Sequence, residues 1–156
     1  MTGCGKSTVG KELARLSGFE FLDLDEMLIE GEGKTPREIF DESGEEYFRQ
    51  LEHGYLLKAL KRENTVISCG GGVILREENR KALKKEQVIW IIRSPSAVLA
   101  HQGVLKRPPI NGDPENYRRL YAKRRALYAG VAKTVIANTD SQSCAKDLAQ
   151  MFGYIK

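Results

Sequence analysis

The sequence predicts an α/β fold in which helices pack against parallel β-strands. Three observations support this prediction. Short apolar stretches alternate with amphipathic helical stretches, a glycine-rich loop directly precedes the first helical stretch, and three further glycines follow a later apolar stretch. Alternation of this kind is typical of parallel strands joined by helices, and such folds bind ligands beyond the carboxyl ends of their strands.

The predicted elements follow one another along the whole chain. The first helical stretch covers 7–16, where apolar residues recur on one face, and a strand is expected at 19–25, where apolar and polar residues alternate. A helix starts at Thr35, because TPRE has capping-box spacing with proline at the first helical position, and a second helical stretch covers 43–62. Further strands are expected at 65–69, 88–92 and 134–138, and further helices at 76–85, 95–101, 114–131 and 143–152.

Length and composition restrict the class of protein. The chain has 156 residues, of which 41% are hydrophobic and 29% charged, as in ordinary globular proteins. No stretch approaches the roughly 20 apolar residues of a membrane span, and no signal or transit peptide is recognisable. Three cysteines without a C-x-x-C pair argue against a disulfide framework or a zinc site. We therefore expect one domain, residues 1–156, in the cytoplasm and without a membrane partner.

The chain begins with MTGCGKST, which matches the later part of the phosphate-binding loop G-x-x-x-x-G-K-[ST]. Glycines let backbone N–H groups converge on phosphate oxygens, Lys6 would reach the β- and γ-phosphates, and Ser7 would ligate Mg²⁺. The first glycine of the loop and the strand that feeds it are missing, and we expect both upstream of Met1. The alternative is a glycine-rich turn with a serine at a helix N-terminus.

Polar and glycine residues follow two of the predicted strands. Asp23 and Asp25 stand two apart, so in an extended chain both carboxylates project to the same side. One could hold Mg²⁺, directly or through water, while the other accepts a hydroxyl proton. Gly70–Gly72 would let a ligand approach the backbone closely. The alternatives are a polar strand end and a flexible turn.

Two arginines are candidates for anion binding. Arg124 shares a helical stripe with three tyrosines at helical spacing, which places a guanidinium among inward-facing rings. A buried arginine needs a partner, and a ligand carboxylate or phosphate is a good one. Arg49 has Glu45 and Glu52 at i−4 and i+3, so a surface ion pair is its strong alternative.

The net charge of +4 comes from one segment. Seven basic and two acidic residues lie between Gly103 and Arg125, which is compatible with a nucleic-acid patch, a site for small anions, or the solvated face of a helix. Arg107 lies in the breaker-rich stretch 103–114, where a loop could close over a nucleotide and exclude water. A charged surface loop is the alternative.

In this order, the stretches resemble the shikimate kinase family. The matching stretches are GCGKSTVGKELA, FLDLD, PREIFDESGEEYFRQLE, ISCGGGV, RP and YAKRRALY, which span nearly the whole chain. The resemblance implies a P-loop fold like that of nucleoside-monophosphate kinases, a three-layer sandwich with a parallel sheet whose first strand is missing here. It also implies transfer of the γ-phosphoryl of ATP to the 3-hydroxyl of shikimate, with Mg²⁺ as cofactor, in aromatic amino acid biosynthesis.

The resemblance further implies roles for individual residues. The lid is expected at about 103–116 and the shikimate-binding helical region at about 26–62, with Phe40 and Phe48 near the substrate. The implied catalytic residues are Lys6, Asp25 and Arg107, and the metal ligands are Ser7 and Asp23. The implied ATP-binding residues are Gly3, Cys4, Gly5, Lys6, Ser7, Thr8 and Arg107, and the implied shikimate-binding residues are Asp25, Arg49, Gly71, Gly72 and Arg124.

Other functions remain open at this point. A gluconate-kinase-like enzyme would share the fold, although the two arginines and the glycine triplet argue against it. A non-catalytic shikimate-binding protein is favoured by the missing strand and opposed by Lys6, Ser7 and both aspartates. Nucleic acid is not expected as a partner, because no aromatic stacking platform accompanies the basic segment. We expect a monomer.

Overall fold

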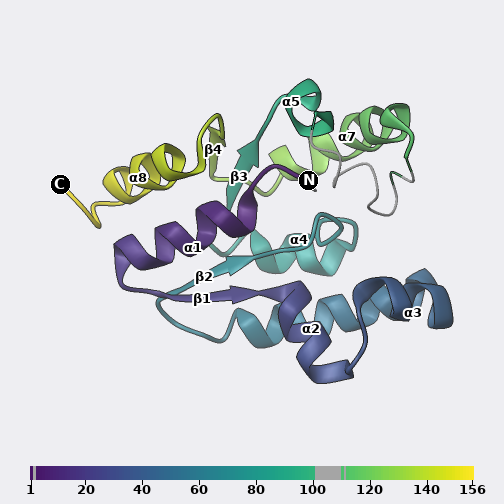
Figure 1. Cartoon of the computed structure of the whole chain (residues 1–156). Helices are drawn as coiled ribbons and strands as arrows, with labels where there is room; N and C mark the ends of the chain where they lie inside the picture. The colour runs from purple at the N-terminus through teal and green to yellow at the C-terminus, as the bar shows by residue number, and fades with distance from the viewer. Residues whose placement is uncertain (2, 101–109, 111) are drawn as a thin grey trace.

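The computed structural model describes residues 1, 3–100, 110 and 112–156, and it has the α/β arrangement that the sequence predicts (Figure 1). Helices and strands alternate along the chain, and most of the helices connect one strand to the next. The elements are α1 (Lys6–Ser17), β1 (Glu20–Asp23), α2 (Leu24–Glu32), α3 (Pro36–Ala59), β2 (Thr65–Ser68), α4 (Glu77–Leu83), β3 (Ile89–Ile92), α5 (Pro95–Leu99), α7 (Pro114–Ala129), β4 (Thr134–Ala137) and α8 (Ser141–Met151).

The strands form two parallel pairs. β1 pairs with β2, with Asp23 opposite Ser68, and β3 pairs with β4, with Ile92 opposite Ala137. In the part of the chain that the structure describes, no strand joins β2 to β3. The predicted parallel sheet is therefore present as two separate halves.

Two apolar clusters pack the helices onto these strands. In the first, α1 and α8 lie side by side, and Val9 and Leu13 of α1 meet Leu148 of α8 (Figure 1). The second and larger cluster joins α3, α4, α5 and α7, and it includes Leu56, Val98 and Tyr117. Because the first cluster also contacts β2, β3 and β4, α1 and α8 cover one face of both strand pairs.

The start of α1 depends on glycine. Gly5 is the residue that caps this helix, and its backbone has a φ of 86°, in the left-handed region that residues with a Cβ rarely adopt. The loop can therefore turn sharply and enter the helix at Lys6. The glycine-rich loop followed by a helix, as predicted from the sequence, is confirmed.

The first predicted strand ends earlier than expected, and the two predicted helical stretches that follow it are one element. The strand expected at 19–25 ends at Asp23, because the carboxylate of Asp23 accepts a hydrogen bond from the backbone N–H of Asp25 and thereby caps α2. The two predicted helical stretches around residue 44 form the single element α3, which is interrupted at Gly44 by non-helical backbone angles. The capping box at Thr35 and Glu38 is formed as predicted.

Two findings bear on the class of protein. None of the helices in the described residues is long and apolar enough to cross a membrane. The three cysteines, Cys4, Cys69 and Cys144, are all free.

The contact between α1 and α8 leads to a first prediction. Leu148 is completely buried in this contact, so Leu148→Ala should lower the free energy of unfolding by about 2–5 kcal/mol. Met151→Ala on the same helix is a matched control, because the Met151 side chain is 61% exposed and its loss should cost no more than about 0.5 kcal/mol. Urea denaturation measures both values. Equal losses for the two variants would contradict this packing.

Candidate active site

The glycine-rich loop is held by side chains from the carboxyl ends of the first strand pair. The Ser7 hydroxyl donates to Oδ2 of Asp23 at 2.8 Å and lies 3.1 Å from the Ser68 hydroxyl. Asp23 ends β1 and Ser68 ends β2, so the first turn of α1 is anchored to both strands. Asp23 and Ser68 are both buried. The predicted proximity of Ser7 and Asp23 is therefore present.

The same loop is also held from the second strand pair. Asn138, directly after β4, is buried, and its Nδ2 donates to the backbone oxygen of Cys4 at 2.8 Å and to Ser141 Oγ at 3.2 Å. A side chain at Gly5 would collide with this amide. Asn138 was not among the predicted site residues, although a polar residue at the carboxyl end of a predicted strand is a usable signal.

Lys6 and Thr8 differ in their surroundings. Lys6 is half-buried, and among the described residues no ion pair joins its ammonium to a carboxylate. Thr8 is exposed, and it lines a depression of about 430 Å³ that runs along α1 as far as Arg15 and is bordered by Ser141 and Gln142 at the start of α8. The N-terminus of α1, with its free backbone N–H groups and the adjacent Lys6, is suited to bind phosphate.

The two aspartates do not lie on one strand face, as the sequence analysis assumed. Asp23 ends β1, whereas Asp25 lies in the first turn of α2. The helix nevertheless directs Asp25 towards the glycine triplet, because a Cβ at Gly70 would lie 3.3 Å from Oδ1 of Asp25 and 3.0 Å from Oε1 of Glu52. The Asp25 carboxylate therefore lies beside the glycine triplet as predicted, but a helix and not a strand places it there.

The glycine triplet Gly70–Gly72 is the point at which the predicted arginines meet. Arg124 donates from Nη1 to the backbone oxygen of Gly71 at 3.0 Å, and the Tyr128 hydroxyl donates to the same oxygen at 2.5 Å. The ring of Tyr128 in turn stacks on Trp90 with centroids 5.7 Å apart. The predicted placement of Arg124 on an inward-facing tyrosine stripe is therefore observed.

Arg49 packs against the next residue of the triplet. A Cβ at Gly72 would overlap the Arg49 guanidinium, so a larger residue there would displace the guanidinium from its present position. Arg49 also donates to Glu52 at 2.8 Å and to Glu45 at 3.4 Å, which are the two ion pairs proposed as its alternative role. The guanidinium is not a surface group, however, because the side chain is only 13% exposed. Its carbon also lies 4.9 Å from the centre of the Phe48 ring.

Glu52 is a buried acid that the sequence analysis treated only as a surface partner. It lies four residues after Phe48 and three before Tyr55, so it shares their buried helical stripe. Burial raises the pKa of Glu52, and the nearby Arg49 opposes this shift. The hydrogen bond of 2.8 Å from Arg49 to Glu52 holds the guanidinium beside Gly72.

The segment after the triplet is fixed by side chains that sequence reasoning also missed. Nδ2 of the fully buried Asn79 donates to the backbone oxygen of Val73 at 2.9 Å, and Oδ1 of Asn79 lies 2.6 Å from Nδ1 of His53. Arg80 donates to the backbone oxygens of Ile74 and Leu75, both at 2.8 Å. These contacts fix the position of the triplet at its carboxyl side.

The remaining predicted residues have mixed outcomes. Phe48 is buried and Phe40 is exposed, with ring centroids 6.2 Å apart on either side of the break at Gly44 in α3. Arg107 and most of the predicted lid at 103–116 lie outside the described residues. Their roles stay predictions.

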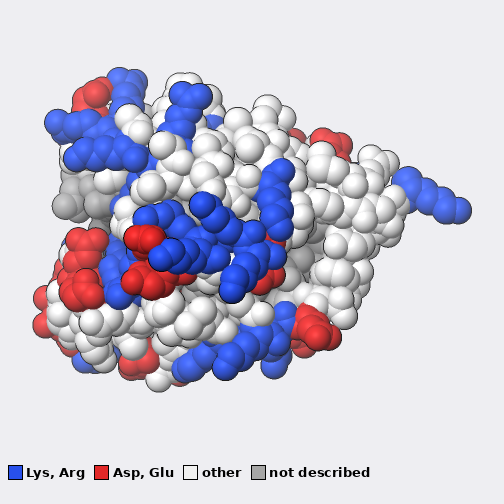
Figure 2. All heavy atoms as spheres, turned by 180° about the vertical axis from the view of Figure 1, so that it is seen from behind, with Lys and Arg blue, Asp and Glu red and all other residues white. Residues whose placement is uncertain are grey.

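The basic excess of the sequence lies partly on α7. Seen from behind the view of Figure 1, Lys and Arg side chains form several groups on this face, with acidic side chains beside them (Figure 2). Arg118 pairs with Glu115 at 2.5 Å and Arg119 with Asp113 at 3.3 Å, all of them exposed. These exposed arginines thus have local acidic partners, which favours a solvated helix face.

A helix that begins with Gly-Lys-Ser at the carboxyl ends of parallel strands is the arrangement of P-loop phosphotransferases, and this chain falls into that class. The family follows from comparison with known proteins. The model of the shikimate kinase family matches residues 2–155, and the chain belongs to this family.

Individual relatives agree with this assignment. The chain is 36% identical to a shikimate kinase of Corynebacterium efficiens over 99% of this chain and 92% of that protein. It is 38% identical to a bifunctional shikimate kinase/3-dehydroquinate synthase of Thermotoga maritima, over 83% of this chain and 26% of that longer protein. A solved shikimate kinase from Acinetobacter baumannii, in complex with shikimate, superposes with a TM-score of 0.90 at 32% identity, over 96% of this chain and 87% of that one.

The buried Glu52 leads to a second prediction. Its folded-state pKa is raised above the ordinary value of 4.5, so its favourable contribution to stability is present below pH 4.5 and is lost as the pH rises through the folded-state pKa. The free energy of unfolding of the wild type should therefore fall relative to that of Glu52→Gln over this window. Urea denaturation at several pH values measures the difference. Glu45→Gln is the control, since Glu45 also contacts Arg49 but is 59% exposed.

If the two stability curves of wild type and Glu52→Gln stay parallel from below pH 4.5 to neutral pH, Glu52 does not titrate in the direction inferred here.

Proposed function

We propose that this chain transfers the γ-phosphoryl group of ATP to the 3-hydroxyl of shikimate, and that the glycine triplet is the centre of its shikimate site. One observation carries the site assignment. Each glycine of the triplet meets a different predicted substrate residue: Gly70 meets Asp25, Gly71 meets Arg124, and Gly72 meets Arg49. Membership of the shikimate kinase family supports the reaction.

The two arginines would bind the carboxylate of shikimate. A guanidinium has five N–H donors, so Arg124 keeps four for a ligand after its bond to Gly71, and Arg49 keeps two after its three bonds to Glu45 and Glu52. Planar guanidinium groups match a carboxylate with two parallel hydrogen bonds. Both arginines are fixed by the protein before a ligand binds, which reduces the entropy lost on binding.

Asp25 and Lys6 would act on the reacting groups. The carboxylate of Asp25 lies beside Gly70, where it could bind shikimate hydroxyls and accept the proton of the attacking hydroxyl. Lys6, at the start of α1, would neutralise charge on the β- and γ-phosphates, and Arg107 is proposed as a second cation on ATP. Such catalysis consists mostly of positioning and charge stabilisation.

The residues at the start of α1 fit Mg²⁺. The Ser7 hydroxyl and the Asp23 carboxylate lie 2.8 Å apart, and oxygen donors of this kind suit a hard cation that keeps several waters and binds substrate phosphates. Ser7 would hold the ion directly and Asp23 directly or through water. When bound, Mg²⁺ would supply positive charge between the β- and γ-phosphates.

The depression between α1 and α8 suits the nucleotide. It is lined by Thr8 and Gln142 and lies directly beside Ser7, which would place the base of ATP against the first turn of α8. We further propose that the protein acts as a monomer in the cytoplasm. A gluconate-kinase-like enzyme and a non-catalytic shikimate-binding protein are the competing functions.

A coupled assay of ADP release separates these functions. It compares shikimate, gluconate and no acceptor with the same protein, ATP and Mg²⁺. We expect turnover that depends on shikimate alone. Turnover with gluconate would favour the first competitor, and shikimate binding by a folded protein without turnover would favour the second.

The assignment of Asp25 gives a third prediction. Asp25→Asn should lower kcat by roughly 10²–10⁴-fold, because the amide cannot accept the proton of the hydroxyl. ATP binding, measured by calorimetry, should survive, since Asp25 lies beside Gly70 rather than on the phosphate loop. Asp41→Asn on the exposed start of α3 is the control and should leave kcat unchanged. A kcat close to wild type would remove Asp25 from the catalytic role.

The assignment of Arg124 gives a fourth prediction. Arg124→Lys should raise the KM for shikimate about tenfold or more, because an ammonium group cannot make the planar two-point contact with a carboxylate. Arg125→Lys makes the same change at the adjacent, exposed position and should leave the KM unchanged. Steady-state kinetics measures both. An equal KM for the two variants would refute the proposed clamp.

A further inference from the structure

Two donors from one helix share the backbone oxygen of Gly71. The Tyr128 hydroxyl lies 2.5 Å from this oxygen, and Nη1 of Arg124 lies 3.0 Å from it. Arg124 and Tyr128 stand four residues apart in α7, so they project from the same face of that helix. One donor is enough to satisfy a backbone oxygen, although its two lone pairs can accept two. The Gly71 oxygen therefore has one donor more than it needs.

The Tyr128 hydroxyl is a rigidly placed donor. The ring of Tyr128 stacks on the indole of Trp90 in β3, with centroids 5.7 Å apart and planes inclined by 21°. The side chain is buried, and burial raises the pKa of Tyr128 to about 12, so the hydroxyl keeps its proton at neutral pH. Tyr128 therefore donates to Gly71 from a position that Trp90 fixes and that does not depend on Arg124.

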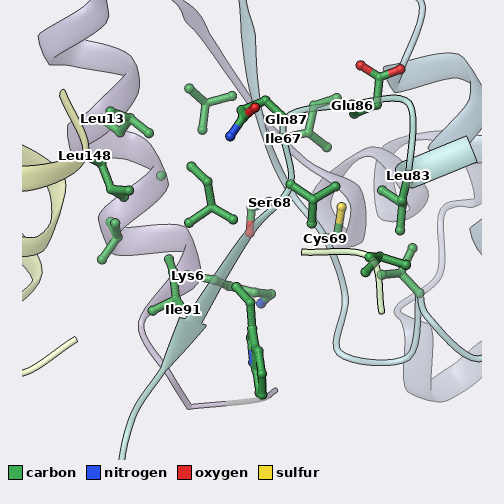
Figure 3. A pocket seen from close by; sticks show the side chains of 18 of the residues that line it. Lys6, Leu13, Ile67, Ser68, Cys69, Leu83, Glu86, Gln87, Ile91 and Leu148 are labelled. Atoms are coloured by element: carbon green, nitrogen blue, oxygen red, sulfur yellow. The ribbon is translucent and has the colours of Figure 1, made fainter. Parts of the chain in front are cut away.

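The two stacked rings lie beside the chain that leads into the glycine triplet. Trp90 and Tyr128 line a cavity of about 350 Å³, and residues 68–70 line the same cavity. Figure 3 shows this cavity, with Ser68 and Cys69 among the side chains around it. A side chain of β3 thus supports the triplet through Tyr128, although the triplet itself follows β2.

Arg124 is the donor that a carboxylate ligand would recruit. In the proposed function its guanidinium binds the carboxylate of shikimate through two parallel hydrogen bonds. The long Arg124 side chain is only half-buried, whereas the Tyr128 ring is held by stacking. Because the donors of a guanidinium lie in one plane, a guanidinium that turns to a ligand lengthens or loses its bond to Gly71. Tyr128 is then the remaining partner of this oxygen.

We propose that Tyr128 is a positioning residue for shikimate: its hydroxyl keeps the Gly71 oxygen hydrogen-bonded while the Arg124 guanidinium turns to the shikimate carboxylate. Without the hydroxyl, the oxygen would lose its last donor whenever Arg124 left it, and an unpaired, partly buried oxygen opposes ligand binding. Tyr128 thus acts through Gly71 and Arg124 rather than by contact with the substrate. It can have this role only if shikimate is the ligand, so the inference rests on the proposed function.

The variant Tyr128→Phe tests this role, because it removes the hydroxyl and keeps the ring on Trp90. We expect the KM and the Kd for shikimate to rise roughly five- to thirtyfold, which corresponds to one unpaired carbonyl oxygen. The kcat and the KM for ATP should stay within about twofold of wild type, since only substrate binding is weakened. Tyr154→Phe is the matched control, because that ring packs on Phe19, at the amino end of β1, and is 41% exposed.

A double variant tests whether Tyr128 acts through Arg124. In an Arg124→Lys protein the guanidinium contact is already lost, so adding Tyr128→Phe should raise the KM for shikimate by a clearly smaller factor than it does in wild type. Thermal unfolding shows that each variant is folded at the assay temperature. Two effects that simply multiply would overturn the proposal, and so would a wild-type KM in Tyr128→Phe.

NMR of the wild type decides the question if Tyr128→Phe does not fold. The carbonyl carbon of Gly71 reports hydrogen bonding to its oxygen, and the side-chain N–H groups of Arg124 report their own partner. On addition of shikimate, we expect the Arg124 signals to move while Gly71 keeps the chemical shift of a hydrogen-bonded carbonyl. A Gly71 shift that moves to the value of an unbonded carbonyl would overturn the proposal.

The wild type also separates a failure of this inference from a failure of the proposed function. If the folded wild type neither binds nor phosphorylates shikimate, the proposed function fails and the role of Tyr128 fails with it. If the wild type does both and Tyr128→Phe has the same kinetics, only the role of Tyr128 fails.

Discussion

The glycine-rich loop and the first turn of α1 hold the two halves of this molecule together at the carboxyl ends of its strands. Ser7 bonds to Asp23 and Ser68 of the first strand pair, and the Cys4 oxygen accepts from Asn138 after the second. In the described chain no strand lies between the halves, so side-chain hydrogen bonds to one loop, together with the packing of α1, fix their relative position at this end. The proposed phosphate-binding site therefore lies where the two strand pairs are joined.

The charged groups of the proposed substrate site are likewise held in place by other groups of the protein. Glu52 fixes Arg49 against Gly72, and the Gly71 oxygen fixes Arg124. An acid and a carbonyl oxygen partly compensate two guanidinium groups in a largely buried region, and this lowers the cost of keeping them away from water. A carboxylate ligand would complete that compensation, which favours an anionic substrate over a neutral one.

The sequence predicted the parallel α/β arrangement and the contents of the site, because glycines, prolines and apolar periodicity are local signals. It misplaced Asp25, since the alternation of FLDLD was extended two residues past the point where the Asp23 carboxylate caps a helix. It also left Glu52 on the surface, although that residue shares the stripe of Phe48 and Tyr55. The contacts of Asn138 and Asn79 join segments far apart in the chain or in different elements, and no local pattern reveals such partners.

The contact between Gly72 and Arg49 has an evolutionary consequence. Every missense change in codon 72 adds at least one carbon where the guanidinium lies, whereas a Cβ at Gly54 would meet nothing within 4 Å. A change in codon 72 would therefore displace the end of the Arg49 side chain, which a change in codon 54 would not do. A change of acceptor that began at Gly72 would thus move Arg49 as well, so gradual divergence is expected to begin elsewhere in the pocket.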